Sequence, residues 1–145
     1  MYNKIFLLLS LILLGCTSSS DVPKSTKTKN NVTAGSKYSI VIFDSLENKL
    51  CEGTLFFDKY DATSFSGNLK IDKKYVDVFK GSDLINGRFA GNKIRETLQL
   101  VFPPNAADYN VYINLNDNGS GILGSWTFTT KKGNENKGKV SGKKI

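Results

Sequence analysis

The 145-residue sequence is short enough to predict one domain. It carries 20 Lys and Arg against 13 Asp and Glu, a net charge of +7 that favours anionic partners. It contains no His, which excludes every catalytic site that needs an imidazole, including Cys–His pairs and Ser–His–Asp triads.

The chain opens with an apolar segment that has the length of a secretory signal. Lys4 supplies a positive start, and residues 5–14 are apolar apart from one Ser. Ten residues are too few to cross about 30 Å of hydrocarbon, but they suit the core of a signal peptide. The segment ends in Leu13-Leu14-Gly15-Cys16, which resembles the lipobox of bacterial lipoproteins.

This resemblance implies that residues 1–15 are removed and that the thiol of Cys16 carries lipid. Two or three acyl chains hold a protein stably at a membrane without spanning it. An ordinary signal peptide with a chance Cys and an uncleaved anchor are the alternatives. Thr17 stands where inner-membrane lipoproteins carry Asp, so the resemblance implies a lipoprotein of the outer membrane, on either its periplasmic or its surface face.

A polar linker is predicted over residues 16–35, between the lipidated Cys and a domain at 36–145. The linker is rich in Ser, Thr, Lys and Asn and offers almost nothing to bury, a composition typical of disordered chain. A flexible segment of this length has a root-mean-square span of about 25 Å. We therefore expect the domain to stand clear of the lipid headgroups.

The domain itself is predicted to be all-β. Apolar and polar residues alternate along 63–71 and again along 110–116, which indicates half-buried strands. Similar runs make about nine candidate strands in all, at 38–43, 50–57, 63–71, 75–79, 84–89, 98–102, 110–116, 122–128 and 139–143. Such a meander hides its apolar face and its edges by closing, so we expect one small antiparallel up-and-down β-barrel of about eight strands. A two-sheet β-sandwich is the alternative.

Turn residues separate most of these runs. Gly91-Asn92 predicts a short hairpin turn, Asp72-Lys73 a second turn, and Asn116-Asp117-Asn118-Gly119 a third. Pro103-Pro104 forbids strand continuation and predicts a longer loop.

Cys51 is predicted to be a small buried apolar residue. If Cys16 carries lipid, Cys51 has no partner for a disulfide within the chain. A nucleophilic role would need a positioned base, and no His is present to supply one.

The interior of the barrel is the first candidate binding site. Four aromatic residues are candidates to line a lumen for a small hydrophobic ligand: Phe89, Tyr112, Trp126 and Phe128. In a barrel this small, such side chains more often fill the core. By alternation Glu96 shares a face with the apolar residues of 98–102, so it is a candidate lumen carboxylate or, alternatively, a rim residue paired with Arg or Lys.

A basic patch is the second candidate. Six lysines fall in the last hairpin and tail and are predicted to meet an anionic partner: Lys131, Lys132, Lys137, Lys139, Lys143 and Lys144. Asn114-x-Asn116-x-Asn118-Gly119 resembles the start of a calcium-binding loop, but Ser125 occupies the position of the essential Glu. We therefore predict no metal, no cofactor and no enzymatic activity.

Two family resemblances concern the domain. Gly87-Arg88-Phe89-Ala90-Gly91 through Glu96 is similar to the Gly-x-Phe-x-Gly-x-x-Ala-x-Glu hairpin of transferrin-binding protein B-like surface lipoproteins, with Ile94 in place of Ala. This resemblance implies an eight-stranded barrel that holds a protein at the cell surface. Gly124-Ser125-Trp126 is similar to the Gly-x-Trp of lipocalins, which in that family lies on the first strand.

Two functions follow from these patterns. The first is a membrane-anchored envelope lipoprotein, monomeric, that acts as a non-enzymatic binding module for a protein or envelope partner. The second is a carrier of a small hydrophobic ligand in the barrel lumen. A nucleic-acid partner is not expected for an exported, anchored protein.

Overall fold

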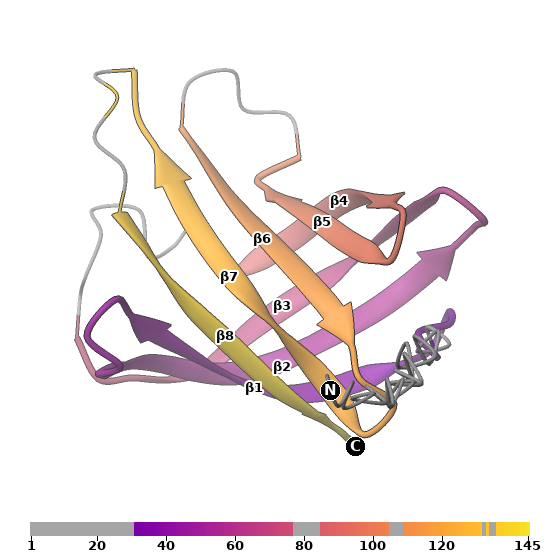
Figure 1. Ribbon diagram of the computed structural model, residues 1–145, viewed down its shortest axis with the longest axis horizontal. Coiled ribbons are helices and arrows are strands. Elements are labelled where there is room, and N and C mark those ends of the chain that lie inside the picture. The colour runs from indigo at the N-terminus through magenta and orange to yellow at the C-terminus, as the bar shows by residue number, and fades with distance from the viewer. Residues whose placement is uncertain (1–30, 77–84, 105–108, 132, 134–135) are drawn as a thin grey trace, which may run out of the picture.

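The computed structural model describes residues 31–76, 85–104, 109–131, 133 and 136–145. The signal segment, Cys16 and most of the predicted linker lie outside these residues. The described chain forms eight strands, labelled in Figure 1: β1 (Lys37–Asp44), β2 (Lys49–Tyr60), β3 (Ser64–Lys74), β4 (Gly87–Ile94), β5 (Thr97–Phe102), β6 (Asn110–Asp117), β7 (Gly121–Thr129) and β8 (Asn136–Lys144).

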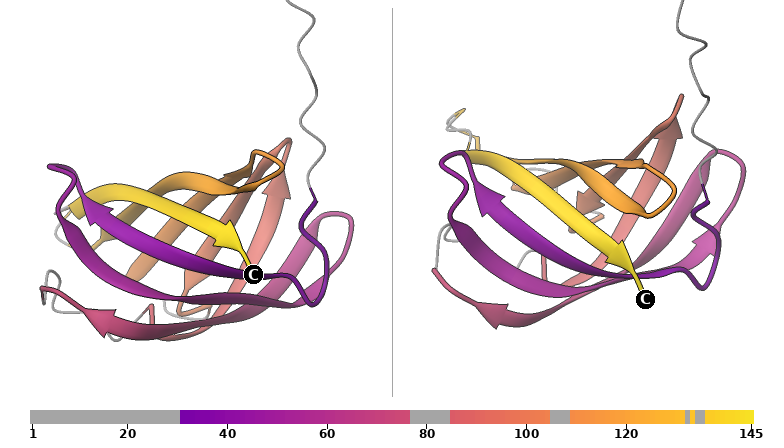
Figure 2. Two further views of the ribbon diagram at one scale, coloured as in Figure 1. Left: turned by 90° about the horizontal axis from the view of Figure 1, so that it is seen from below. Right: turned by 60° about the horizontal axis from the view of Figure 1, so that its bottom comes forward.

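The eight strands form a closed antiparallel barrel. Each strand pairs with the next in the chain, and β8 returns to pair with β1, where Ile40 lies opposite Gly142. Figure 2 shows this closure, with the end of β8 beside the start of β1. The all-β barrel prediction is confirmed, and the sandwich alternative is wrong. The described residues include no helix long and apolar enough to cross a membrane.

The core follows from the alternation within each strand. In β5, Leu98, Leu100 and Phe102 point inward and are fully buried, while the residues between them are half-buried on the outer face. One cluster of buried apolar residues joins all eight strands. Each strand therefore has one buried apolar face, and closure of the sheet packs these faces against one another.

The β4–β5 hairpin differs from its prediction. Gly91 and Asn92 do not form the turn but continue β4, opposite Leu100 and Gln99 of β5. The chain turns instead at Arg95, whose φ is 58°, and Glu96. The predicted turn at Gly91-Asn92 is wrong because a glycine inside a strand and a glycine in a turn look alike in sequence.

The β3–β4 region also differs from its prediction. Asp72 and Lys73 lie within β3 rather than in a turn, because β3 runs on to Lys74. Tyr75 and Val76 belong to no strand, although their N–H groups still donate to the carbonyl of Leu50 on β2. The candidate strand at 75–79 is therefore wrong at these two residues, and its remainder lies outside the described residues.

The domain begins earlier than residue 36. Val32 is only 3% exposed and belongs to the core. The backbone N–H of Asn31 donates to Asp117 Oδ2 at 2.7 Å, and that of Gly35 donates to the carbonyl of Phe57 at 2.7 Å. Residues 31–35 therefore pack on the barrel, and the predicted linker extends too far toward the C-terminus. The sequence suggested a linker here because Val32 is a lone large apolar residue in a polar segment.

The two ends of the barrel are built differently. Residues 31–36, the short β2–β3, β4–β5 and β6–β7 turns, and Ile145 share one end, which we call the tether end. The β1–β2 turn shares the other end with the last residues of β3, β5 and β7 and the first residues of β4, β6 and β8, and we call it the loop end because the connections between these strands are the longer ones in sequence. The chain thus enters the barrel at the end opposite its longer loops.

Candidate functional site

Aromatic side chains fill the interior near the tether end. The ring of Phe57 meets the rings of Tyr38, Tyr60, Phe65 and Phe89 edge-on, with centroids 5.5 to 6.4 Å apart. Phe57 has no exposed surface, and Tyr38 and Phe89 are each 1% exposed. Side chains beside a water-sized space would keep accessible surface, so these rings leave no such space. Burial, followed by the charge of Asp117, raises the pKa of Tyr38 to about 12.

Three of the predicted lumen residues belong to this packed interior. Phe89 and Trp126 are each 1% exposed and Phe128 is 7% exposed. The indole Nε1–H of Trp126 donates to the backbone carbonyl of Phe43 at 2.7 Å, which ties β7 to β1. This packing favours a structural role for all three, because their side chains occupy the space in which a bound ligand would lie.

The other two predicted lumen residues lie elsewhere. Tyr112 is half-buried on the outer face of β6, because it alternates with the inward Val111 and Ile113. Glu96 is exposed in the β4–β5 turn, since β5 begins one residue later and the inward face of residues 98–102 does not extend to it. Neither is a lumen residue, and Glu96 lies at the barrel rim, as its alternative placed it.

Cys51 lies in β2 with 6% of its surface exposed, as a buried thiol. Burial raises its pKa from 9.0 to about 11. Among the described residues, no group of three Cys, Asp or Glu side chains lies close enough to hold a metal ion.

The folded barrel is expected to shield Cys51 from thiol reagents. A pKa higher by two units leaves roughly 100-fold less thiolate at pH 8, and burial slows access further. Labelling with iodoacetamide at pH 8, followed by mass spectrometry, should modify Cys51 in urea but not in buffer. Rapid labelling of the native domain would contradict this placement.

The predicted basic patch does not form one cluster. Lys131 and Lys137 lie toward the loop end, whereas Lys143 and Lys144 lie at the tether end. Lys143 lies six positions after Lys137 on β8, which is about 20 Å along a strand. Lys139 lies between them, ion-paired with Glu47. Lys132 lies outside the described residues.

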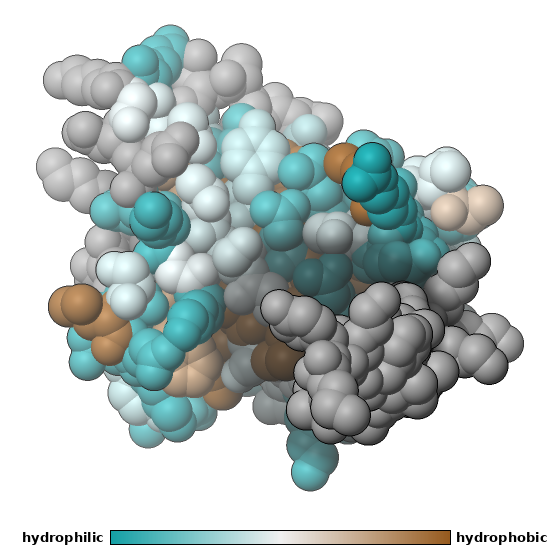
Figure 3. All heavy atoms as spheres, in the orientation of Figure 1, coloured by the Kyte–Doolittle hydropathy of each residue, from teal (hydrophilic) through white to brown (hydrophobic). Residues whose placement is uncertain are grey.

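An apolar groove on the outer wall was not predicted. It lies across β1, β7 and β8 and has a volume of about 440 Å³. Leu123 is its most exposed apolar side chain, at 52%. Figure 3 shows that apolar (brown) residues are scattered among hydrophilic (teal) ones on this side of the barrel. We call this surface the outer groove; its lining residues are Phe43, Glu47, Leu123, Gly124, Lys139, Val140 and Ser141.

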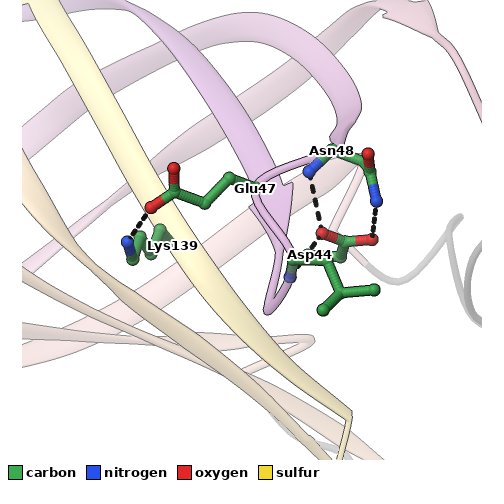
Figure 4. Close-up of polar contacts among 5 residues, drawn as sticks. Asp44, Glu47, Asn48 and Lys139 are labelled. Carbon is green, nitrogen blue, oxygen red and sulfur yellow. Dashed lines mark hydrogen bonds and ion pairs between the residues drawn. The ribbon is translucent and has the colours of Figure 1, made fainter.

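An ion pair closes one side of the outer groove. Glu47, in the β1–β2 turn, accepts a hydrogen bond from Nζ of Lys139 on β8, as Figure 4 shows. That bond and the lysine charge hold the pKa of Glu47 below its ordinary value. Glu47 has a φ of 67°, a backbone conformation that non-glycine residues rarely adopt. The groove thus offers an apolar floor beside one cation and one anion.

Asp44 organises the turn that carries Glu47. Its carboxylate accepts hydrogen bonds from the backbone N–H groups of Leu46 and Asn48, both at 2.8 Å, and from the Asn48 side chain at 2.9 Å (Figure 4). These bonds, the side-chain bond first, hold the pKa of Asp44 below its ordinary value of 3.8.

Substituting Asn for Asp44 is expected to lower the urea midpoint of unfolding, because a charged acceptor becomes a neutral one. The folded pKa lies below the unfolded pKa, so the stabilisation is fully present above pH 5 and is lost as the pH falls below about 4. Urea titrations at pH 7 and pH 3 should therefore show a difference between wild type and variant that shrinks at pH 3. A constant difference would contradict the assigned cause.

Comparisons with known proteins add one likeness of fold. No protein-family model matches the chain, and no curated protein matches it. The chain is similar to a solved structure of a redesigned beta barrel, with a TM-score of 0.42 and 10% identity over 74% of this chain and 87% of that one.

Proposed function

We propose that this chain is a lipid-anchored protein of the cell envelope, held at the outer membrane. Its barrel is a non-enzymatic binding module for a protein or envelope partner. The observation that carries this proposal is the contrast between a filled interior and an exposed apolar groove. Inside the barrel, Phe57 and Trp126 are at most 1% exposed, whereas on the outer wall Leu123 is 52% exposed.

The chemistry of the outer groove suits a segment that is partly apolar. Burying the exposed half of a leucine side chain contributes about 1 kcal/mol, or roughly fivefold in affinity. Glu47 and Lys139 offer polar contacts at the rim of the groove, which fix orientation more than they add affinity. A protein partner that presents one or two apolar side chains flanked by polar groups fits this surface.

Site-specific photo-crosslinking in the native host tests the outer groove. A benzophenone amino acid at Leu123 should crosslink one defined partner, and the same group at Gln99, on the outer face of β5, should not. Substituting Ser for Leu123 in the purified protein should then weaken the identified partner about fivefold in a titration. Equal crosslinking from both positions, or unchanged affinity, would count against the groove.

The anchor is tested independently of the groove. Metabolic labelling with palmitate should mark the wild-type chain, and substituting Ala for Cys16 should abolish the label and release the protein from membranes. Because Cys51 is buried in the barrel, it gives no alternative site for the label and needs no substitution of its own. Unlabelled wild-type protein would overturn the anchor and leave the groove untouched.

A further inference from the structure

Three lysines and one isoleucine meet at a corner of the tether end. The backbone N–H of Ile145 donates to the carbonyl of Lys37 at 3.0 Å, which places the last residue beside the start of β1. Pairing of β8 with β1 sets Lys143 opposite Ser39. Figure 2 shows these two strand ends side by side. We call this surface the tether corner; its residues are Lys37, Lys143, Lys144 and Ile145.

The tether corner is also the place where the described chain begins. Asn31 is held there from two sides: its N–H donates to Asp117 Oδ2 at 2.7 Å, and its carbonyl accepts a hydrogen bond from Nζ of Lys144 at 3.4 Å. Val32, next in the chain, is buried in the core. Asn31, the described residue nearest to Cys16 in the sequence, is therefore fixed at this corner.

The chemistry of the tether corner is cationic with an apolar centre. Ile145 is 68% exposed, and the three lysines are exposed too, with Nζ of Lys37 over the ring of Phe56 on β2 and Nζ of Lys144 at the carbonyl of Asn31. Asp117 is 8% exposed and already accepts hydrogen bonds from the N–H groups of Asn31 and Gly119, so it adds no accessible negative charge. A terminal carboxylate on Ile145 would offset one of the three charges and leave two.

We propose that the tether corner docks on the anionic lipid surface of the membrane that holds the anchor. The inference rests on the proposed lipidation of Cys16. Fifteen residues, 16–30, would join anchor and corner, with a root-mean-square span of about 21 Å if flexible. Three of them are lysines, which each strengthen attraction to an anionic surface about fivefold. Docking turns the loop end, with its longer connections, away from the membrane.

Lysine reactivity on vesicles tests this orientation. The mature chain, residues 16–145, is coupled through the Cys16 thiol to maleimide lipids, which reproduces the anchor whether or not cells lipidate it. Cys51 does not compete at neutral pH because it is buried. A water-soluble acylating reagent then reports the exposure of each lysine by mass spectrometry, on vesicles of phosphatidylcholine alone or with one third phosphatidylglycerol.

We expect Lys37, Lys143 and Lys144 to react at least threefold more slowly on the phosphatidylglycerol vesicles at low salt, and at equal rates on both vesicles in 0.5 M NaCl. Lys131 and Lys137, toward the loop end, are internal controls and should react equally on both. Equal rates for the tether corner, or slower reaction of Lys131 and Lys137, would overturn the proposal.

A matched pair of variants confirms the cause. The double variant Lys143→Glu, Lys144→Glu should abolish the shielding of Lys37. The double variant Lys131→Glu, Lys137→Glu changes the net charge by the same amount and should leave that shielding intact. Circular dichroism checks that both variants keep the barrel. Because coupling is chemical, a wild-type chain that is unlipidated in cells but shielded on these vesicles would refute the anchor and not the docking surface.

Discussion

Replacing Phe57 with alanine is expected to destabilise the barrel by about 4 kcal/mol, close to the largest effect of a core truncation. Phe57 is fully buried on β2, and its ring touches four other rings in the interior: Tyr38, Tyr60, Phe65 and Phe89. No neighbouring side chain can collapse into the space without leaving its own contacts. Urea unfolding followed by the fluorescence of buried Trp126 measures the loss.

The neighbouring phenylalanine is a matched control. Phe56 precedes Phe57 on the same strand but points to the outer face, where Nζ of Lys37 lies 5.4 Å from its ring centroid. Alanine at Phe56 loses a half-buried ring and a cation–π contact, so about 1 kcal/mol is expected. Similar losses for Phe56 and Phe57 would mean that the ring of Phe57 is not held in a tightly packed core.

Period-two alternation predicted the strands, and the need of a meander to cover its apolar face and its edges predicted the closed barrel. Residues 110–116 were assigned to a strand that the structure extends by one residue to Asp117, and the inward and outward faces were correct along it. The same alternation places Tyr112 on the outer face of β6, away from the inward Val111. Its prediction as a lumen residue rested on its aromatic character and not on its position in the strand. In this protein the position in the pleat, and not the residue type, decided which side chains entered the core.

The local signals failed where a strand ended. In the sequence, alternation places Glu96 on the inward face of β5. In the structure, Arg95 and Glu96 form the turn before β5, so Glu96 is not part of the strand and does not point inward. Val32 shows the converse, since a polar segment docked through one apolar side chain and two backbone hydrogen bonds. Each outcome depends on partners elsewhere in the barrel that a window of neighbours cannot contain.

The outer groove could not have been predicted from any one strand. Phe43 and Leu123 are 80 positions apart and become neighbours only because β8 closes onto β1. Leu123 is the one apolar side chain among the polar outward residues of β7, and Phe43 follows Val41 on the outer face of β1. Scattered apolar residues of this kind are ordinary on a protein surface, so neither strand alone indicates a groove. A signal does exist: Leu123 breaks the polar side of the pattern in 122–128, and such breaks on β1 and β7 meet once the barrel is closed.

Phenylalanine and glycine alternate across β3 and β4, and this pattern explains the Phe-x-Gly sequences on both strands. Phe65 lies opposite Gly91, and Gly67 lies opposite Phe89, so each ring covers the backbone of a glycine on the next strand. The Phe-x-Gly spacing on each strand thus has a packing reason. Gly67 and Gly91 are needed for close approach, because a Cβ atom at either position would lie within 2.5 Å of the facing phenylalanine ring.

Substituting alanine for Gly67 is therefore expected to cost about 2 kcal/mol by overpacking. A methyl group there would lie 2.0 Å from the carbonyl oxygen of Phe56 and 2.5 Å from Cζ of the Phe89 ring, so both strand and ring must move. Urea unfolding gives the loss, and alanine at the outward Asn68 is the control, with a change within about 0.5 kcal/mol. Combining Gly67→Ala with Phe89→Leu should recover the part due to the ring, because leucine vacates the space above the methyl group. Full additivity of the two single changes would show instead that the backbone contact with Phe56 carries the whole effect.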